Sequence, residues 1–181
     1  MYRKLLVTAV ASTALVTVAL PAGPAVAHPA PASPSAAYFE GRTIDLSTSW
    51  KEARSCLVWQ ARNVVECFRT PDERDARAAR LQAHQTRKVA AASCRSPLHL
   101  YEHVNGRGRD LTFYDRGPWQ NLGRYDFNDK TSSYRTGSCY VHLAEHNDGR
   151  GHWYPGNTGP RHYEPRMRNG WNDRVSAIQL R

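Results

Sequence analysis

Two short clusters of oxygen-bearing side chains are the residues of this chain best suited to hold a metal ion. Each cluster has one asparagine, one aspartate and one serine: Asn128, Asp129 and Ser132 in the first, and Asn172, Asp173 and Ser176 in the second. Amide, carboxylate and hydroxyl oxygens are the ligands that a hard cation such as calcium prefers. The sequence therefore predicts calcium sites. The alternative is a metal-free hairpin clip, because these side chains also bond local backbone in turns.

Both clusters lie in a segment that occurs twice. Residues 101–108 recur at 144–151, an offset of 43, and residues 127–133 recur at 171–177, an offset of 44. Two markers that repeat at nearly the same separation indicate one structural unit used twice. The elements that position the two clusters should therefore be equivalent.

Enzyme signatures are absent from the sequence. It has no Gly-x-Ser-x-Gly, no His-Glu-x-x-His and no phosphate-binding loop. The adjacent pairs Glu102-His103 and Glu145-His146 lie in β-prone segments, where neighbouring side chains point to opposite faces and cannot cooperate. We expect a protein that is not an enzyme.

The first residues have the pattern of a secretory signal peptide. A basic lead, Tyr2-Arg3-Lys4, precedes an apolar run over residues 5–20 and the small-residue site Ala25-Val26-Ala27. Residues 1–27 are expected to direct secretion. Residues 28–37 are rich in Pro, Ala and Ser, which predicts a disordered linker. No other segment approaches the length of a membrane span.

The formal net charge is +9, from 25 Lys and Arg against 16 Asp and Glu. This charge favours acidic partners such as a surface polymer. Because the charged residues are interspersed rather than grouped, the sequence predicts no specific nucleic-acid site.

The four cysteines imply two disulfides in an exported chain. Four cysteines allow three connectivities, and the sequence alone does not choose among them. We favour Cys56–Cys67, because two β-prone runs around a short break at residues 60–63 predict a hairpin with facing cysteines. Cys94–Cys139 is the remaining pair. No Cys-x-x-Cys pair is present, which disfavours zinc.

Residues 38–93 are expected to form this hairpin and one peripheral helix. Thr70-Pro71-Asp72-Glu73 is a helix start with a capping box, and an Ala- and Arg-rich run follows to about Ala91. Residues 94–181 are richer in Tyr, Trp and Gly, with short alternating runs and frequent turn residues. This texture predicts an all-β sandwich in which the two copies pack face to face and the Cys94–Cys139 bridge ties them together.

Residues 97–181 resemble the βγ-crystallin Greek-key domain of calcium-binding microbial proteins. That family pairs two motifs, each with an aromatic residue followed seven positions later by glycine, as at Tyr101 and Gly108. Each motif also has an acid-or-amide pair, two free positions, Ser or Thr, and Ser. Residues 128–133 match at every position, and residues 172–177 match at all but the last, Ala177. The resemblance extends to small secreted metalloproteinase inhibitors with the same fold.

The resemblance implies a sandwich of two Greek-key motifs in which each ion is shared between the motifs. One motif would supply an Asn or Asp oxygen and a backbone carbonyl, and the other a serine hydroxyl. It implies ligation through backbone carbonyls at four positions: Lys130, Arg174, Glu102 and Glu145. The side chains of Lys130 and Arg174 are expected to oppose the ion, so we expect weak binding of one or two Ca²⁺ ions.

The sequence thus predicts a secreted, monomeric calcium-binding structural or interaction protein. One alternative is an inhibitor of an extracellular metalloprotease, for which the Cys56–Cys67 hairpin is the candidate loop. A second is a toxin-like or cell-wall-binding protein that uses its basic charge on an acidic polymer.

Overall fold

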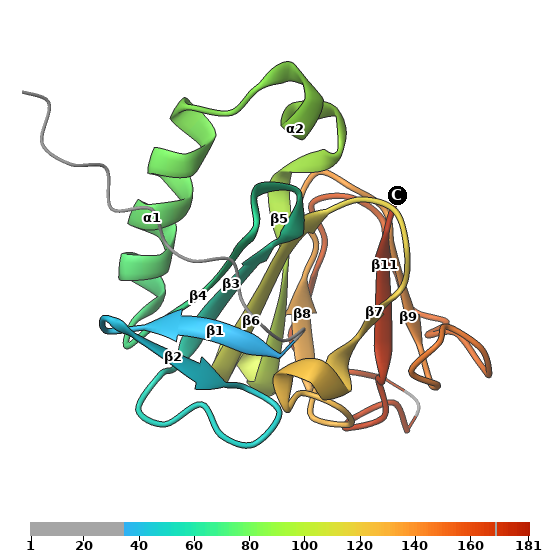
Figure 1. Cartoon of the computed structure of the whole chain (residues 1–181). Coiled ribbons are helices and arrows are strands. Elements are labelled where there is room, and N and C mark those ends of the chain that lie inside the picture. The colour runs from blue at the N-terminus through green and yellow to red at the C-terminus, as the bar shows by residue number, and fades with distance from the viewer. Residues whose placement is uncertain (1–34, 169) are drawn as a thin grey trace, which may run out of the picture.

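Two β-sheets form the body of the protein (Figure 1). The structure is a computed structural model that describes residues 35–168 and 170–181, so the expected signal peptide and residues 28–34 of the expected linker lie outside the described residues. The strands of the large sheet are β1 (Ala36–Phe39), β2 (Arg42–Asp45), β3 (Ser55–Trp59), β4 (Val64–Phe68), β5 (Ser93–His103), β6 (Arg107–Asp115), β8 (Ser133–Arg135) and β10 (Tyr163–Glu164). Those of the small sheet are β7 (Gln120–Asn121), β9 (Val141–Ala144) and β11 (Ala177–Leu180).

The strand order shows two Greek-key motifs that exchange one strand each. The large sheet runs β10-β8-β5-β6-β3-β4-β1-β2, and the small sheet runs β7-β11-β9. In the first motif, β7 leaves β5, β6 and β8 to pair with β11. In the second, β10 leaves β9 and β11 to pair with β8. This is the all-β sandwich of paired motifs that the sequence predicts, with both motifs contributing to each sheet.

Alternating apolar side chains fill the space between the sheets. Leu98, Leu100, Leu111 and Phe113 point inward from β5 and β6, where intervening positions are polar or less buried. The facing side chains of the small sheet are Val141, Leu143, Ile178 and Leu180, all in the same core cluster. Burying both inner faces is what makes the pair of sheets stable.

Both expected disulfides are present. Cys56 and Cys67 are facing residues of β3 and β4 with their Cα atoms 4.1 Å apart. Cys94, at the start of β5, bonds Cys139, just before β9, so this bridge joins corresponding points of the two motifs. Two such bonds are typical of proteins in an oxidising, extracellular environment.

The strands β1 to β4, within residues 36–68, extend the first motif's sheet. β3 pairs in parallel with β6, for example Ser55 with Asp110, and β4 pairs in parallel with β1. The prediction of disorder is wrong for Ala36 and Ala37, which are buried in β1. The reason is a tight turn at Glu40 and Gly41, both with positive φ, which folds β2 back on β1.

The single expected helix is two helices, α1 (Pro71–Ala83) and α2 (Arg87–Ala91). The capping box between Thr70 and Glu73 is present as predicted. The break follows His84, and a second cap begins α2 because the Thr86 side chain accepts a hydrogen bond from Val89 N. In the described part of the chain, no helix is long and apolar enough to cross a membrane.

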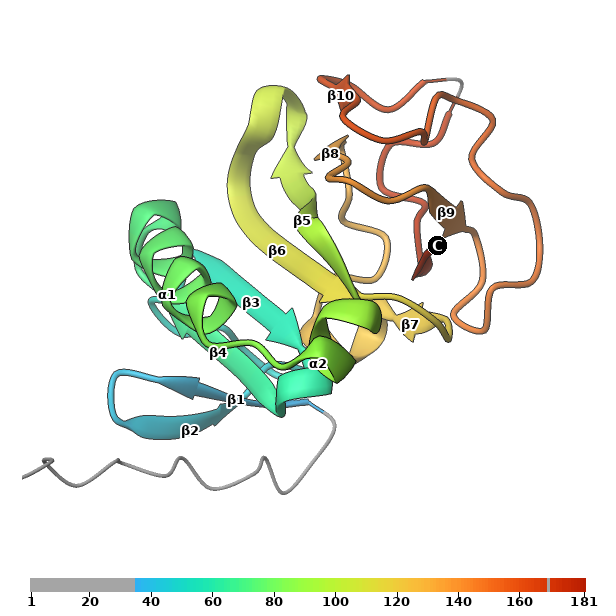
Figure 2. The same ribbon diagram turned by 90° about the horizontal axis from the view of Figure 1, so that it is seen from above.

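A buried arginine anchors α1 to the outer face of the large sheet, on the side away from β9 (Figure 2). The Arg74 guanidinium, 3% exposed, donates to Ser55 Oγ at 3.0 Å, to Thr112 Oγ1 at 2.9 Å and to the Asp110 carboxylate. Neighbouring apolar contacts come from Ala78, Leu81, Leu57, Trp59 and Tyr114. The helix is therefore tied to the sheet by paired charge as well as by apolar burial.

Candidate metal site

The serine of the first cluster lies beside the aspartate of the second. Ser132 Oγ is 3.0 Å from Asp173 Oδ1 and 2.8 Å from the backbone carbonyl oxygen of Glu102. The three oxygens come from three separate loops or strands. We call this group, with Asn172, the Ser132–Asp173 site.

The reciprocal arrangement occurs on the other hairpin. Ser176 Oγ is 3.1 Å from Asp129 Oδ1, so each motif lends its serine to the aspartate of the other. We call this group, with Asn128, the Ser176–Asp129 site. Glu145 lies in the lining of the hollow above it.

The backbone holds both aspartates in the same conformation. Asp129 and Asp173 have positive φ values of 53° and 55°, a region that Asp adopts more readily than most residues. Asp129 N donates to Val175 O at 3.0 Å, and Asp173 N donates to Thr131 O at 3.1 Å. Backbone hydrogen bonds thus hold the two hairpins together. The pairing of each serine with the other motif's aspartate therefore does not depend on side chains alone.

The two asparagines make equivalent hydrogen bonds in the two motifs. Asn128 Nδ2 donates to Asp129 Oδ2, and Asn172 Nδ2 donates to Asp173 Oδ2, both at 2.7 Å. Each aspartate therefore has Oδ2 turned to its own hairpin and Oδ1 turned to the partner motif's serine. This division leaves Oδ1 directed toward the place where a shared ion would lie.

Glycines allow the first hairpin of each motif to fold close to the site. Gly108 has φ of 80°, and a Cβ there would lie 2.9 Å from Glu102 Cβ and His103 Cδ2. Gly151 has φ of 77°, and its Cβ would lie 2.7 Å from His146 Cδ2. Both positive φ values favour glycine, and a Cβ at position 108 would crowd Glu102 while one at position 151 would crowd the His146 ring.

Ser133, which follows the cluster serine Ser132 in the first motif, has a structural role. Ser133 Oγ donates to His103 O at 2.6 Å and accepts from Gly106 N at 3.1 Å, so it fastens the turn after β5. The corresponding residue of the second motif is Ala177, which has no hydroxyl to do this. Ser133 therefore differs in function from Ser132, although the two are adjacent.

The cationic side chains of Lys130 and Arg174 are turned to acidic partners. Lys130 Nζ lies 2.6 Å from Asp126 Oδ1, and Arg174 Nη2 lies 2.7 Å from Glu145 Oε1. We expected the side-chain charges of Lys130 and Arg174 to oppose an ion. Each positive charge is instead paired with a neighbouring carboxylate, Asp126 for Lys130 and Glu145 for Arg174. The backbone carbonyls of Lys130 and Arg174 remain predicted ligands.

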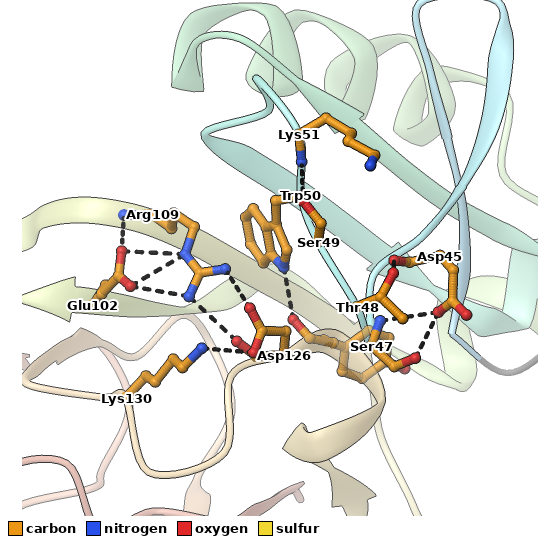
Figure 3. Close-up of polar contacts among 11 residues, drawn as sticks. Asp45, Ser47, Thr48, Ser49, Trp50, Lys51, Glu102, Arg109, Asp126 and Lys130 are labelled. Carbon is orange, nitrogen blue, oxygen red and sulfur yellow. Dashed lines mark hydrogen bonds and ion pairs between the residues drawn. The ribbon is translucent and has the colours of Figure 1, made fainter.

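Arg109 links the first hairpin to these charges (Figure 3). Its guanidinium contacts the Glu102 carboxylate at 2.9 Å and Asp126 Oδ2 at 2.9 Å, and Asp126 in turn holds Lys130. Burial raises the pKa of Asp126, but hydrogen bonds from Lys130 and Arg109 outweigh it and hold that pKa below its usual range. Asp126 therefore stays ionised beside the site. The sequence analysis missed this residue, because residues 126–130 form a turn rather than a helix, and their spacing predicts no pairing of Asp126 with Lys130.

The two sites differ in charge. The hollow at the Ser176–Asp129 site, about 450 Å³, is lined by three carboxylates and one guanidinium: Asp129, Glu145, Asp148 and Arg150. The hollow at the Ser132–Asp173 site has a similar volume, about 450 Å³, but its lining contains one carboxylate, Asp173, and the cation Arg166. Asp148 and Arg166 were not among the predicted site residues.

The side-chain donors at the two sites are oxygens, the kind of ligand that a hard cation accepts. Within the described residues, no three or more His, Cys, Asp and Glu side chains gather as a metal-binding group. Each site instead combines one aspartate, one serine hydroxyl and nearby carbonyl oxygens. Such oxygen sets suit calcium, which accepts side-chain, backbone and water ligands in flexible geometry.

Comparisons with known proteins give structural neighbours alone. No family model matches the sequence, and no curated protein matches it. Among solved structures, a βγ-crystallin from Ciona intestinalis is similar at 20% identity and TM-score 0.40, covering 48% of this chain and 100% of that one.

Two bacterial structures are similar to the same extent. A βγ-crystallin domain from Clostridium beijerinckii has 18% identity and TM-score 0.38, over 47% of this chain and 97% of that one. A βγ-crystallin domain from Flavobacterium johnsoniae has 24% identity and TM-score 0.36, over 46% of this chain and 92% of that one. The strand order of the two sheets, with one strand exchanged between the motifs, is βγ-crystallin-like. At these identities and TM-scores, the similarity says nothing about what the chain binds.

Proposed function

We propose that this is a secreted, non-enzymatic protein whose βγ-crystallin-like sandwich binds calcium weakly and acts as a structural or interaction module. The observation that supports it most is the crossed pairing of Ser132 with Asp173 and of Ser176 with Asp129. Two loops from different motifs place a hydroxyl oxygen 3.0 Å from a carboxylate oxygen at one site and 3.1 Å at the other. Two oxygens at this separation can both bind one calcium ion at about 2.3–2.6 Å. The two disulfides support an extracellular location.

The proposed ligands follow the two crossed pairs. At each site, the aspartate and the opposite serine supply side-chain oxygens, and the asparagine lies beside them. Backbone carbonyls complete each set, from Lys130, Arg174, Glu102 and Glu145. On binding, the serine hydroxyl, which now donates to the aspartate, would turn a lone pair toward the ion.

Charge count predicts weak binding. Each proposed set contains one carboxylate ligand, and calcium affinity rises with ligand charge, so we expect dissociation constants on the order of 10⁻⁵ to 10⁻³ M. The Ser176–Asp129 site should be the tighter one, because Glu145 and Asp148 make its surroundings more negative than those of Asp173, which faces Arg166.

Calcium at these positions would join the two motifs. An ion held by ligands from both hairpins binds the folded sandwich and not the unfolded chain, so it stabilises the fold. At a concentration 100 times the dissociation constant, the gain is about 2.7 kcal/mol. A secreted protein that meets millimolar calcium would be held in its folded form by this linkage.

Calorimetric titration of the metal-stripped protein tests the proposal, with melting temperature followed in parallel. We expect heat of binding and a rise in melting temperature at millimolar Ca²⁺. Asp129→Asn should weaken binding at least tenfold at one site. Asp72→Asn, which removes an exposed carboxylate at the start of α1, is the matched control and should leave binding unchanged. No heat and no melting shift in the wild-type protein would reject calcium binding.

The candidate loop of the protease-inhibitor alternative is exposed at Gln60, Ala61 and Asn63. The turn between β3 and β4 is tied to the body: Gln60 N and Ala61 N donate to Asp115 at 2.6 and 2.8 Å, and Arg62 Nη1 donates to Leu81 O at 2.7 Å. An assay against a thermolysin-type enzyme at micromolar protein separates this alternative from the proposed function.

A further inference from the structure

One end of the molecule carries basic residues without acidic neighbours in the sequence. Between Asp75 and Glu102 the chain has no acidic residue. This stretch forms the second half of α1, α2 and the first part of β5. Figures 1 and 2 both place α2 beside the start of β5, next to the turn between β3 and β4.

The basic side chains of this stretch are exposed. We define the basic end as five residues that are exposed in the structure: Arg80, His84, Arg87, Lys88 and Arg95. A hydrogen bond of 2.9 Å from Gln82 Nε2 to Arg95 O ties α1 to β5. The five residues therefore come from three neighbouring elements, α1, α2 and the start of β5.

The acid-free stretch, rather than the lack of ion pairs, distinguishes the basic end from other basic positions. Some arginines elsewhere meet carboxylates, as in Arg69 with Glu40, Arg77 with Glu66 and Arg174 with Glu145. Within residues 35–168 and 170–181, none of the five residues of the basic end forms an ion pair with an acidic side chain.

Two acidic residues that border this stretch, Asp75 in sequence and Asp115 opposite Ser93 in the sheet, are engaged by other groups. Asp115 is buried and accepts hydrogen bonds from the backbone of Gln60 and Ala61, and Asp75 pairs with Arg74. The charge of the basic end is therefore left uncompensated by the protein itself. Such a surface attracts anions at long range and is sensitive to salt.

The lack of large exposed hydrophobic side chains among the described residues near the basic end limits the kind of anion that it can bind. The large exposed hydrophobic residues of the described chain, Tyr140 and Trp153, lie in the second motif and not on α1 or α2. The basic end thus lacks aromatic rings to stack single-stranded bases and apolar wedges to enter a bilayer. Arginine and lysine on an open surface instead suit repeated phosphate groups on an extended chain.

We propose that the basic end binds a linear phosphodiester polymer outside the cell, of the poly(glycerol phosphate) type. The two disulfides place the chain in an oxidising environment, where the polyanions are surface polymers rather than nucleic acid. A flexible polymer with one charge per repeat can follow the corner formed by α1, α2 and β5.

Binding of fluorescently labelled poly(glycerol phosphate) tests the proposal. The variant Arg87→Gln/Lys88→Gln/Arg95→Gln removes three charges from the basic end. Arg54→Gln/Arg107→Gln/Arg124→Gln removes three exposed charges from other elements and is the matched control. We expect the first variant to lose at least tenfold in affinity at about 50 mM salt, and its salt slope to fall by about 2, near 0.7 per lost contact.

The control variant should bind within about twofold of the wild-type protein with the same salt slope. Unchanged circular dichroism and melting temperature confirm that both variants fold. Equal losses in the two triple variants would show attraction by net charge alone and overturn the proposal, as would no binding by the wild-type protein. Tighter binding of duplex DNA, or of phosphatidylcholine vesicles with about one-third phosphatidylglycerol, would overturn the choice of polymer.

Discussion

The indole of Trp50 donates a 2.7 Å hydrogen bond to the backbone carbonyl of Tyr125, 75 residues further along the chain. Trp50 is 3% exposed, and the centre of its ring lies 4.9 Å from the Arg109 guanidinium carbon (Figure 3). The centre of the Phe127 ring is 5.8 Å from that of Trp50. The residue belongs to the loop after β2, whereas Tyr125 and Phe127 lead into the Asn128 hairpin. The N-terminal extension thus supports the hairpin that carries one metal cluster.

Trp50→Phe should destabilise the protein by about 1–3 kcal/mol, because it leaves a buried carbonyl without a donor and weakens the contact with Arg109. Urea unfolding measures this loss. Trp153→Phe is the control: Trp153 also donates Nε1 to a carbonyl, that of Gly149, but is 48% exposed, so water can replace the bond. A loss at Trp153 as large as at Trp50 would contradict this account.

The buried hydroxyl of Thr131 has no hydrogen-bond partner among residues 35–168 and 170–181. The residue is 0% exposed, and the corresponding residue of the second motif is Val175, also 0% exposed. Thr131→Val should stabilise the protein by about 1 kcal/mol, because it removes an unsatisfied polar group and keeps the side-chain shape. Thermal or urea unfolding of the variant and the wild-type protein shows whether the free energy of unfolding rises, as predicted, or falls.

Thr136 provides the opposite case. Its hydroxyl donates to Gly159 O at 2.6 Å and accepts from His162 N at 2.8 Å. Thr136→Val should therefore destabilise by about 1–3 kcal/mol, since it leaves buried backbone groups unpaired. Two buried threonines with opposite responses would show that partners, not burial alone, set the effect.

Glu145 gives the protein a stability that depends on acid pH. Hydrogen bonds from Arg174 and then from His152 lower the pKa of Glu145 from 4.5 to about 2. A carboxyl whose folded pKa is depressed binds fewer protons folded than unfolded between these two values. Its contribution is therefore fully present above pH 4.5 and is lost as the pH falls toward 2.

Unfolding measured from pH 2 to pH 6 in the presence of a chelator checks this window. The difference in stability between wild type and Glu145→Gln should be constant above pH 4.5 and vanish near pH 2. A difference that persisted unchanged at pH 2 would show that Glu145 acts through packing rather than charge. The ¹³C shift of its carboxyl carbon gives the pKa directly.

Local patterns predicted the parts of the fold that local chemistry determines. The facing cysteines of the β3–β4 hairpin and the Thr70–Glu73 capping box depend on residues near in sequence, and both predictions are confirmed. The duplication, read with the family resemblance, also predicted that Ser132 would lie near the Asn172 turn. The structure places it there.

Non-local contacts explain what the sequence did not predict. The parallel pairing of β3 with β6 has no local signal, because each strand reads as an ordinary β-prone run. The β1–β2 hairpin had a signal in Glu40-Gly41 between β-prone residues, but the Pro- and Ala-rich segment before it concealed the start of the fold. The partner of Arg174, Glu145, lies on the other hairpin of the same motif and could not be inferred from spacing.

Calcium stoichiometry in two double variants tests the central claim most directly. If the sites are crossed, Ser132→Ala/Asp173→Asn damages one site twice and should still bind one ion in calorimetry. Ser132→Ala/Asp129→Asn damages both sites and should bind none. The reverse result, one ion bound by the second variant and none by the first, would mean that each hairpin binds its own ion, and would contradict the shared sites.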